Sequence, residues 1–96
     1  TTIPKSVSLS ANYPNPFNLS TTIEYELPEQ SMVFLQIFNA LGQRVRSLVE
    51  AKQPYGRYVV RWDGTTDSGD EVATGVYFVR ICANGSILTR KMLLLK

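Results

Sequence analysis

The sequence contains no histidine and only one cysteine, Cys82, among its 96 residues. Without histidine, Ser-His and Cys-His nucleophilic catalysis is excluded, and so are most zinc sites. One cysteine cannot form an internal disulfide, and a free cysteine usually behaves as a small buried apolar residue. We therefore predict that Cys82 packs in or beside a strand and that the chain is not an enzyme.

The sequence also lacks a long apolar run and a strong excess of charge. No run approaches the ~20 apolar residues that a transmembrane helix requires. The net charge is +2, and the ten lysine and arginine residues are scattered, which argues against nucleic acid as a partner. The length and the 44% hydrophobic content fit one folded domain. We expect residues 7–96 to form this domain and residues 1–6 to be the end of a linker.

Short runs of alternating apolar and polar residues, separated by proline and glycine, dominate the chain. Such runs predict strands. The predicted strands are residues 7–11, 21–27, 32–38, 43–49, 57–62, 76–83 and 86–95. Seven short strands without a convincing helix predict an all-β fold, a seven-stranded antiparallel β-sandwich of the Ig-like or fibronectin-III-like type.

Three of these runs carry further information. Residues 32–38 are apolar on both faces, which predicts a strand that is either central or partly covered by a partner. The apolar positions of residues 43–49 change face, which indicates a bulge or a bend, and a short helix over residues 44–51 is the alternative. Asn84-Gly85 is typical of a type I′ turn and predicts a hairpin between the last two strands.

Residues 12–18 read Asn-Tyr-Pro-Asn-Pro-Phe-Asn and form the stiffest stretch of the chain. Pro14 and Pro16 restrict φ and remove two backbone donors, so this stretch is neither a helix nor a central strand. Tyr13 and Phe17 are large aromatic residues that favour burial. We predict a structural loop between the first two strands, in which Tyr13 and Phe17 close one end of the sandwich.

Residues 63–74 form a polar loop that contains Asp63, Asp67, Asp70 and Glu71. Carboxylates close to glycines suit calcium, but the spacing differs from that of an EF-hand loop. Aspartate and glycine also build ordinary turns. We expect a solvated loop of turns and no cofactor, with a calcium site at Asp63, Asp67 and Asp70 as the alternative.

The ten aromatic residues suggest a second class of function. An exposed row of them would indicate a carbohydrate-binding face, although most occupy inward positions of the predicted strands. Tyr55, in a Pro-Tyr-Gly loop, is the best candidate for exposure. An accessory module that binds carbohydrate or a partner domain of the same secreted chain is therefore the alternative function.

Several short motifs occur in the order that is found in a known family. The proline stretch is followed by Ser20-Thr21-Thr22-Ile23, then Trp62-Asp63-Gly64, then Gly75-Val76-Tyr77-Phe78, and finally by the closing residues 91–96. Together they resemble the type A C-terminal sorting domain of the bacterial type IX secretion system. They are also similar to the Ig-like module of flagellar hook-capping proteins. The resemblance extends from about Leu9 to Lys96.

This resemblance implies that the domain is a sorting signal at the C-terminus of a larger exported protein. Such a domain follows an N-terminal cargo domain of the same chain through the periplasm. The outer-membrane translocon then recognises it, and a sortase-like protease cuts it off, here near residues 1–6 or before. The cargo is delivered to the cell surface or the extracellular space.

The resemblance also implies which residues take part in sorting and recognition. They are Gly75, Val76, Tyr77, Lys91, Met92, Leu93, Leu94 and Lys96. A terminal hairpin with an exposed edge suits recognition by strand addition, in which backbone hydrogen bonds provide affinity.

Overall fold

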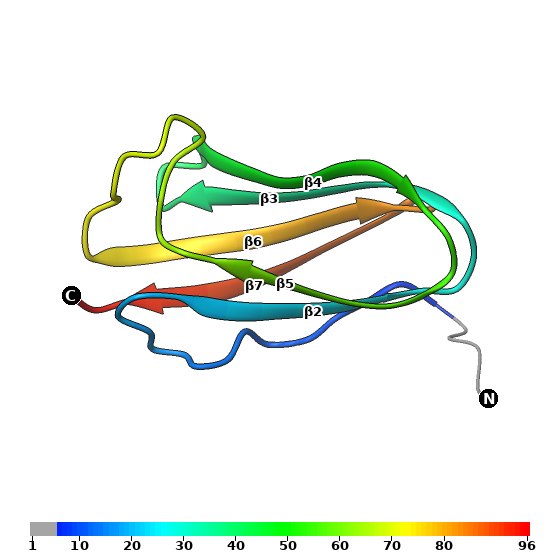
Figure 1. Cartoon of the computed structure of the whole chain (residues 1–96), viewed down its shortest axis with the longest axis horizontal. Helices are drawn as coiled ribbons and strands as arrows, with labels where there is room; N and C mark the ends of the chain where they lie inside the picture. Colours follow the sequence, from blue (N-terminus) through cyan, green and yellow to red (C-terminus); the bar gives the residue numbers. More distant parts are fainter. Residues whose placement is uncertain (1–5) are drawn as a thin grey trace.

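The computed structural model describes residues 6–96 and consists of two packed antiparallel sheets (Figure 1). The strands are β1 (Ser8–Leu9), β2 (Thr21–Leu27), β3 (Ser31–Asn39), β4 (Arg44–Gln53), β5 (Gly56–Trp62), β6 (Gly75–Ala83) and β7 (Ser86–Leu94). One sheet has the order β1-β2-β5 and the other β4-β3-β6-β7. The predicted seven-stranded, Ig-like sandwich is confirmed. Apart from Ser6, the predicted linker lies outside the described residues.

Strand β2 shows how alternating apolar and polar residues correspond to the two faces of a strand. Ile23, Tyr25 and Leu27 point into the core and are fully buried, whereas Glu24 and Glu26 lie on the outer face. The predicted bounds of β2 are those of the structure. Strands β5, β6 and β7 differ from their predictions by one residue at one end, and β3 is longer by one residue at each end. Strand β3 lies between β4 and β6, so its predicted central position is confirmed.

Strands β1 and β4 differ most from the prediction. Strand β1 has two residues instead of five, because the chain leaves the ladder with β2 after Leu9. Strand β4 is longer than predicted, and its pairing with β3 shifts register after Leu35 and after Ile37. The expected bend is confirmed, and the alternative helix over residues 44–51 is wrong.

The turn between β6 and β7 has the predicted chemistry. Asn84 has φ 50° and Gly85 has φ 76°, and a type I′ turn requires positive φ at both positions. The turn sets the register of the hairpin, in which Ala83 pairs with Ser86 and Gly75 with Leu94.

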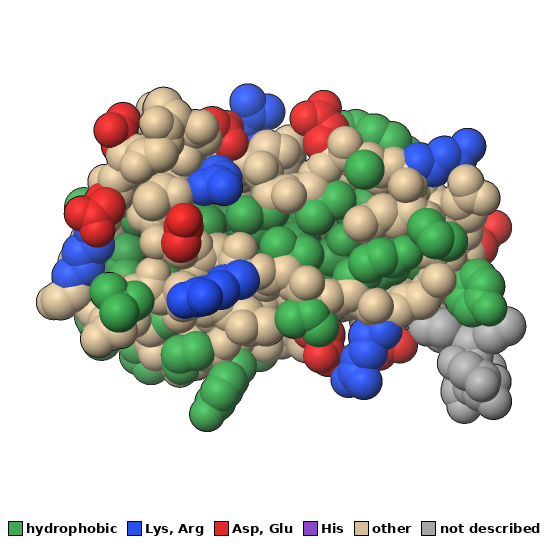
Figure 2. All heavy atoms as spheres, viewed as in Figure 1, with side chains coloured by type: hydrophobic (Ala, Val, Ile, Leu, Met, Phe, Trp, Pro, Cys, Tyr) green, Lys and Arg blue, Asp and Glu red, His purple; other side chains and the backbone are tan. Residues whose placement is uncertain are grey.

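The two long sides of the sandwich differ. On one side β1 contacts β7, and the Arg90 Nε–H donates a hydrogen bond to the Leu9 carbonyl at 2.8 Å. On the other side β4 and β5 are the outer strands of their sheets, and hydrophobic side chains are visible between them (Figure 2). Val45, Val49 and Val60 lie there, half-buried against the core. The sandwich is therefore open along the side of β4 and β5. Residues 6–96 form no helix that would span a membrane.

Candidate functional site

The proline loop, residues 10–20, lies against the C-terminal end of β7 (Figure 1). The Phe17 N–H donates to the Leu93 carbonyl at 3.0 Å, and the Leu95 N–H donates to the Phe17 carbonyl at 2.9 Å. Phe17 and Leu94 thus form a parallel bridge. Two segments from opposite ends of the chain are joined through their backbones.

The side chain of Asn15 extends this contact along β7. Its Oδ1 accepts a hydrogen bond from the Leu93 N–H at 3.0 Å, and its Nδ2 donates to the Lys91 carbonyl at 3.4 Å. The Lys96 N–H in turn donates to Thr74 Oγ1 at 3.1 Å. The loop therefore covers the edge of β7 from Lys91 to Leu95. The expectation of an exposed terminal edge is wrong for this half of the strand, because its polar groups already have partners.

Asn12 and Thr21 hold the loop in shape from within. Asn12 Nδ2 donates to Thr21 Oγ1 at 2.9 Å and to the Pro14 carbonyl at 3.2 Å, and Thr21 Oγ1 donates to the same carbonyl at 2.8 Å. Both side chains are buried. Both residues belong to motifs noted in the sequence, but their contact with each other was not predicted. Short polar residues on either side of a proline stretch, which cannot satisfy its own backbone, are the feature that points to them.

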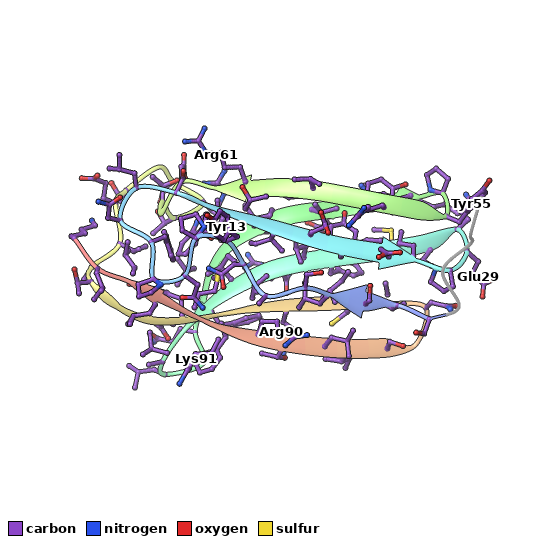
Figure 3. The ribbon with its side chains drawn as sticks, turned by 90° about the horizontal axis from the view of Figure 1, so that it is seen from below. Tyr13, Glu29, Tyr55, Arg61, Arg90 and Lys91 are labelled. Carbon is purple, nitrogen blue, oxygen red and sulfur yellow. The ribbon has the colours of Figure 1, made fainter. Side chains whose placement is uncertain are left out.

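Tyr13 and Phe17 have opposite environments. Phe17 is 2% exposed, as predicted, but Tyr13 is 79% exposed, so the prediction that Tyr13 closes the sandwich is wrong. The backbone of Tyr13 pairs with that of Thr22 on β2, through hydrogen bonds of 2.8 and 3.0 Å. Residues paired across strands share a face, and Thr22 faces solvent. Tyr13 is labelled in Figure 3.

Three aromatic rings close this end of the sandwich instead. Trp62 lies between Phe17 and Tyr77, with ring centroids 5.7 Å and 5.5 Å away. The Trp62 Nε1–H donates to the Thr65 carbonyl at 2.9 Å, and the Tyr77 hydroxyl donates to the Ala73 carbonyl at 2.6 Å. Burial raises the pKa of Tyr77. The cluster ties the proline loop, β5 and β6 into one packed unit.

Except for Lys96, the predicted recognition residues come together in the antiparallel ladder of β6 and β7. Gly75 pairs with Leu94, Val76 with Leu93 and Tyr77 with Met92. Their side chains divide between the two faces of the sheet. Met92, Leu94 and Tyr77 are buried, Val76 and Leu93 are half-buried on the outer face, and Lys91 and Lys96 are exposed. Figure 3 shows Lys91 projecting away from the sandwich.

Two carboxylates of the polar loop, those of Asp63 and Asp67, lie near Arg46. Asp63 accepts hydrogen bonds from the Thr65 hydroxyl and N–H, and these together with Arg46 hold the pKa of Asp63 below its usual value. Asp67 accepts a hydrogen bond from the Ser47 N–H at 2.9 Å and lies 3.9 Å from Arg46. Within residues 6–96, no three potential metal ligands converge. The aspartates thus attach the loop to β4.

Tyr55 is 58% exposed, as predicted. In Figure 3 it lies at the end of the molecule away from Tyr13. Tyr58, its near neighbour on β5, stacks on Tyr25 at 5.3 Å and is half-buried. The exposed tyrosines of the described segment therefore do not form a row of the kind that binds a polysaccharide.

The topology and the packed ends define an Ig-like β-sandwich domain of the all-β class. Residues 18–86 match the family described as the FlgD Ig-like domain, and the chain belongs to this family. No curated protein matches the chain.

Two solved structures from Porphyromonas gingivalis have similar folds. The chain resembles part of dimeric latent PorU with a TM-score of 0.76 and 24% identity, over 98% of this chain and 10% of PorU. It resembles part of PorZ, described as an essential bacterial surface component of the type-IX secretion system, with a TM-score of 0.57 and 21% identity. That match covers 94% of this chain and 11% of PorZ. The chain therefore spans about a tenth of the length of either protein.

Proposed function

We propose that this chain is a non-catalytic sorting domain that directs a larger exported protein through the type IX outer-membrane translocon to the cell surface. The observation that carries the proposal is the bridge between Phe17 and Leu94. It unites the two segments on which the resemblance to sorting domains depends. The similarity to parts of long chains, one of them a surface component of this secretion system, supports it.

The partners in this proposal are the translocon, a sortase-like protease and an N-terminal cargo domain of the same chain. A partner can read only side chains that reach the surface. Lys91 on β7 and Lys96, which lies just beyond β7, are exposed. Met92, Leu94 and Tyr77 are buried and serve to hold the hairpin, while Gly75 permits its start at φ 156°. Val76 and Leu93, which lie on the outer face of the ladder, complete the recognition surface.

The burial of Met92 and Leu94 decides how the proposal is tested. A deletion of residues 92–96 removes both from the core and also removes the partners of the proline loop. Loss of secretion after this deletion would follow from loss of the fold as well as from loss of a recognition site. Exposed charges are the better targets, because surface substitutions change stability by no more than about 0.5 kcal/mol.

The experiment fuses the domain to an exported reporter in a bacterium that has a type IX system. The amount of reporter on the surface and in the medium is compared with the amount in the periplasm. We expect the domain to deliver the reporter, and the K91E/K96E double variant to deliver several-fold less. K52E reverses an exposed charge on β4 and is the matched control. A domain that leaves the reporter in the periplasm refutes the proposal.

A second candidate function is a module that packs on a neighbouring domain. The open side between β4 and β5, with half-buried Val45, Val49 and Val60, supports it. Hydrogen–deuterium exchange of the full-length protein and of this domain distinguishes the two. Added protection of residues 44–53 and 56–62 in the full-length protein supports packing on a neighbour, and equal exchange contradicts it.

A further inference from the structure

A hollow of about 230 Å³ lies on the outer face of the four-stranded sheet. Phe38, Phe78, Arg80 and Thr89 line it, and the turn between β3 and β4 forms its rim. Phe38 pairs with Phe78, and Arg80 pairs with Thr89, so the lining comes from three adjacent strands. The hollow lies on the face of the sheet, whereas the proline loop covers the edge of β7, and Lys91 is a neighbour of both. The proposal below rests on Arg80 and does not depend on the sorting function.

Arg80 is the charged group of this hollow. Its Cζ lies over the Phe38 ring, 4.3 Å from the centroid, in a cation–π contact. The N–H donors of a guanidinium lie in its plane, in a fork that matches a planar acceptor. The Nε atom is buried and has no hydrogen-bond partner. A buried donor without an acceptor is rare in proteins and calls for an explanation.

Arg80 differs in this respect from every other arginine between Ser6 and Lys96. Arg44, Arg46 and Arg57 form ion pairs with aspartate or glutamate, and the remaining two donate hydrogen bonds to oxygen atoms. The residues directly opposite Arg80 on β3 and β7 are Gln36 and Thr89, which are uncharged. The positive charge of Arg80 is therefore uncompensated within the described domain.

We infer that this hollow binds the carboxylate of an aspartate or glutamate side chain presented by a protein partner. The guanidinium supplies two parallel N–H donors that match a carboxylate. The Thr89 hydroxyl supplies a further donor at the wall. The rings of Phe38 and Phe78 pack on the apolar stem of the side chain and exclude water, which strengthens the ion pair. Lys91, opposite Phe78 and exposed, adds positive potential beside the entrance.

The size and the surroundings of the hollow favour a protein carboxylate. Pockets for small organic ligands measure roughly 300–1,000 Å³, so this hollow suits one side chain. The same face continues with apolar side chains, among them Phe34 and Cys82, both half-buried, and Ile87, which is 67% exposed. A charged anchor surrounded by apolar surface is typical of the centre of a protein interface. Among the residues that line the hollow, a phosphate group would meet one guanidinium and one hydroxyl, with Lys91 beside the entrance as the next cation.

The test is an NMR titration of the ¹⁵N-labelled domain with capped peptides of the form Leu-Glu-Leu and Leu-Gln-Leu. We expect the glutamate peptide to shift the amide signals of residues 38–42, 78–80 and 89 in a saturable manner. The glutamine peptide should bind at least tenfold more weakly. Inorganic phosphate is titrated in parallel and should bind no better than the glutamine peptide.

Three variants complete the design. R80Q should weaken binding of the glutamate peptide at least tenfold, and R80K should give an intermediate loss because lysine keeps the charge but not the planar fork. R61Q removes an exposed guanidinium from the other sheet and should bind like the parent domain. Thermal melts verify that each variant is folded. Equal binding of both peptides, full binding by folded R80Q, or phosphate binding as tight as that of the glutamate peptide overturns the inference.

Discussion

Phe17 and Leu94 lie side by side in a parallel bridge, with hydrogen bonds of 3.0 Å and 2.9 Å joining Phe17 to the two neighbours of Leu94. Both side chains point into the core. The end of β7 therefore has a hydrogen-bonded neighbour on each side, β6 on one and the proline loop on the other. A partner that reads this end of the chain meets side chains and not a free strand edge.

The first prediction concerns the aromatic closure of the sandwich. Phe17→Ala should lower the free energy of unfolding by about 3–5 kcal/mol, because the ring is buried against Trp62. Tyr13→Ala is the matched control and should change it by about 0.5 kcal/mol or less, since this ring is exposed. Urea denaturation of both variants checks the prediction, and equal losses would contradict it.

The second prediction separates the buried from the exposed residues of the terminal segment. Met92→Ala should cost about 2–5 kcal/mol, because the side chain is fully buried. Leu95→Ala should cost much less, because Leu95 is exposed and its hydrogen bond to Phe17 uses the backbone. Thermal melts compare the two. A stable Met92→Ala variant would show that this end of β7 is not part of the core.

The third prediction concerns the hairpin between β6 and β7. Gly85 has φ 76°, and no atom would touch an added Cβ, so the cost of Gly85→Ala is conformational. We expect a loss of about 1–2 kcal/mol, the cost of placing a side chain in the left-handed region. Asn84→Gly, at φ 50°, should be close to neutral, because glycine is favoured at both central positions of a type I′ turn. Chemical denaturation that ranks the two variants in the reverse order would contradict a type I′ turn.

The fourth prediction concerns alkaline pH. Burial raises the pKa of Tyr25, against the opposing effect of its hydrogen bond to Gln53, and burial also raises the pKa of Tyr77. Each neutral phenol is thus favoured by the fold. The unfolded chain releases these protons near the ordinary value of 10.0 and the folded chain at higher pH. Stability should be fully present below pH 10.0 and should fall as the pH rises through the folded values.

The Tyr25→Phe/Tyr77→Phe variant tests this linkage. It should lose about 0.5–1.5 kcal/mol per hydrogen bond at pH 7, because the hydroxyls of both residues have partners. Its stability should then depend less steeply on pH above 10.0 than that of the parent. Denaturation curves at pH 7, 10 and 11 compare the slopes, and an unchanged slope would assign the alkaline loss to other groups.

The strands and turns were predictable because they follow from local patterns. Alternation placed Ile23, Tyr25 and Leu27 on one face of β2, and Asn84-Gly85 placed the hairpin. The bend in β4 was visible as a change of face. The prediction that Tyr13 is buried was wrong. It rested on the size of the side chain, whereas the backbone pairing of Tyr13 with Thr22 decides the direction in which the side chain points.

The candidate site was predictable only in part. The order of the motifs pointed to the proline stretch and to the segments that form the ladder from Gly75 to Leu94. The role of the ladder in recognition was inferred from the resemblance to sorting domains. Nothing local indicates that Asn15 satisfies the backbone of Lys91 and Leu93, because such a contact depends on how the two ends of the chain meet. The sequence also did not predict that Arg80 lies opposite uncharged residues, because the pairing of β6 with β3 and β7 determines which residues are its neighbours.

The amino-acid sequence by itself determined the all-β class, the strands and the hairpin of this domain, since period, turn residues and prolines act over a few neighbouring positions. Only the tertiary structure decided that the proline loop covers the end of β7, that Tyr13 faces solvent, and that the Nε of Arg80 has no hydrogen-bond partner. The physical reason is that hydrogen-bond satisfaction and charge compensation are set by residues distant in the chain. The stretch from Asn12 to Asn18 is thus a stiff local sequence whose role is defined by the strand on which it docks.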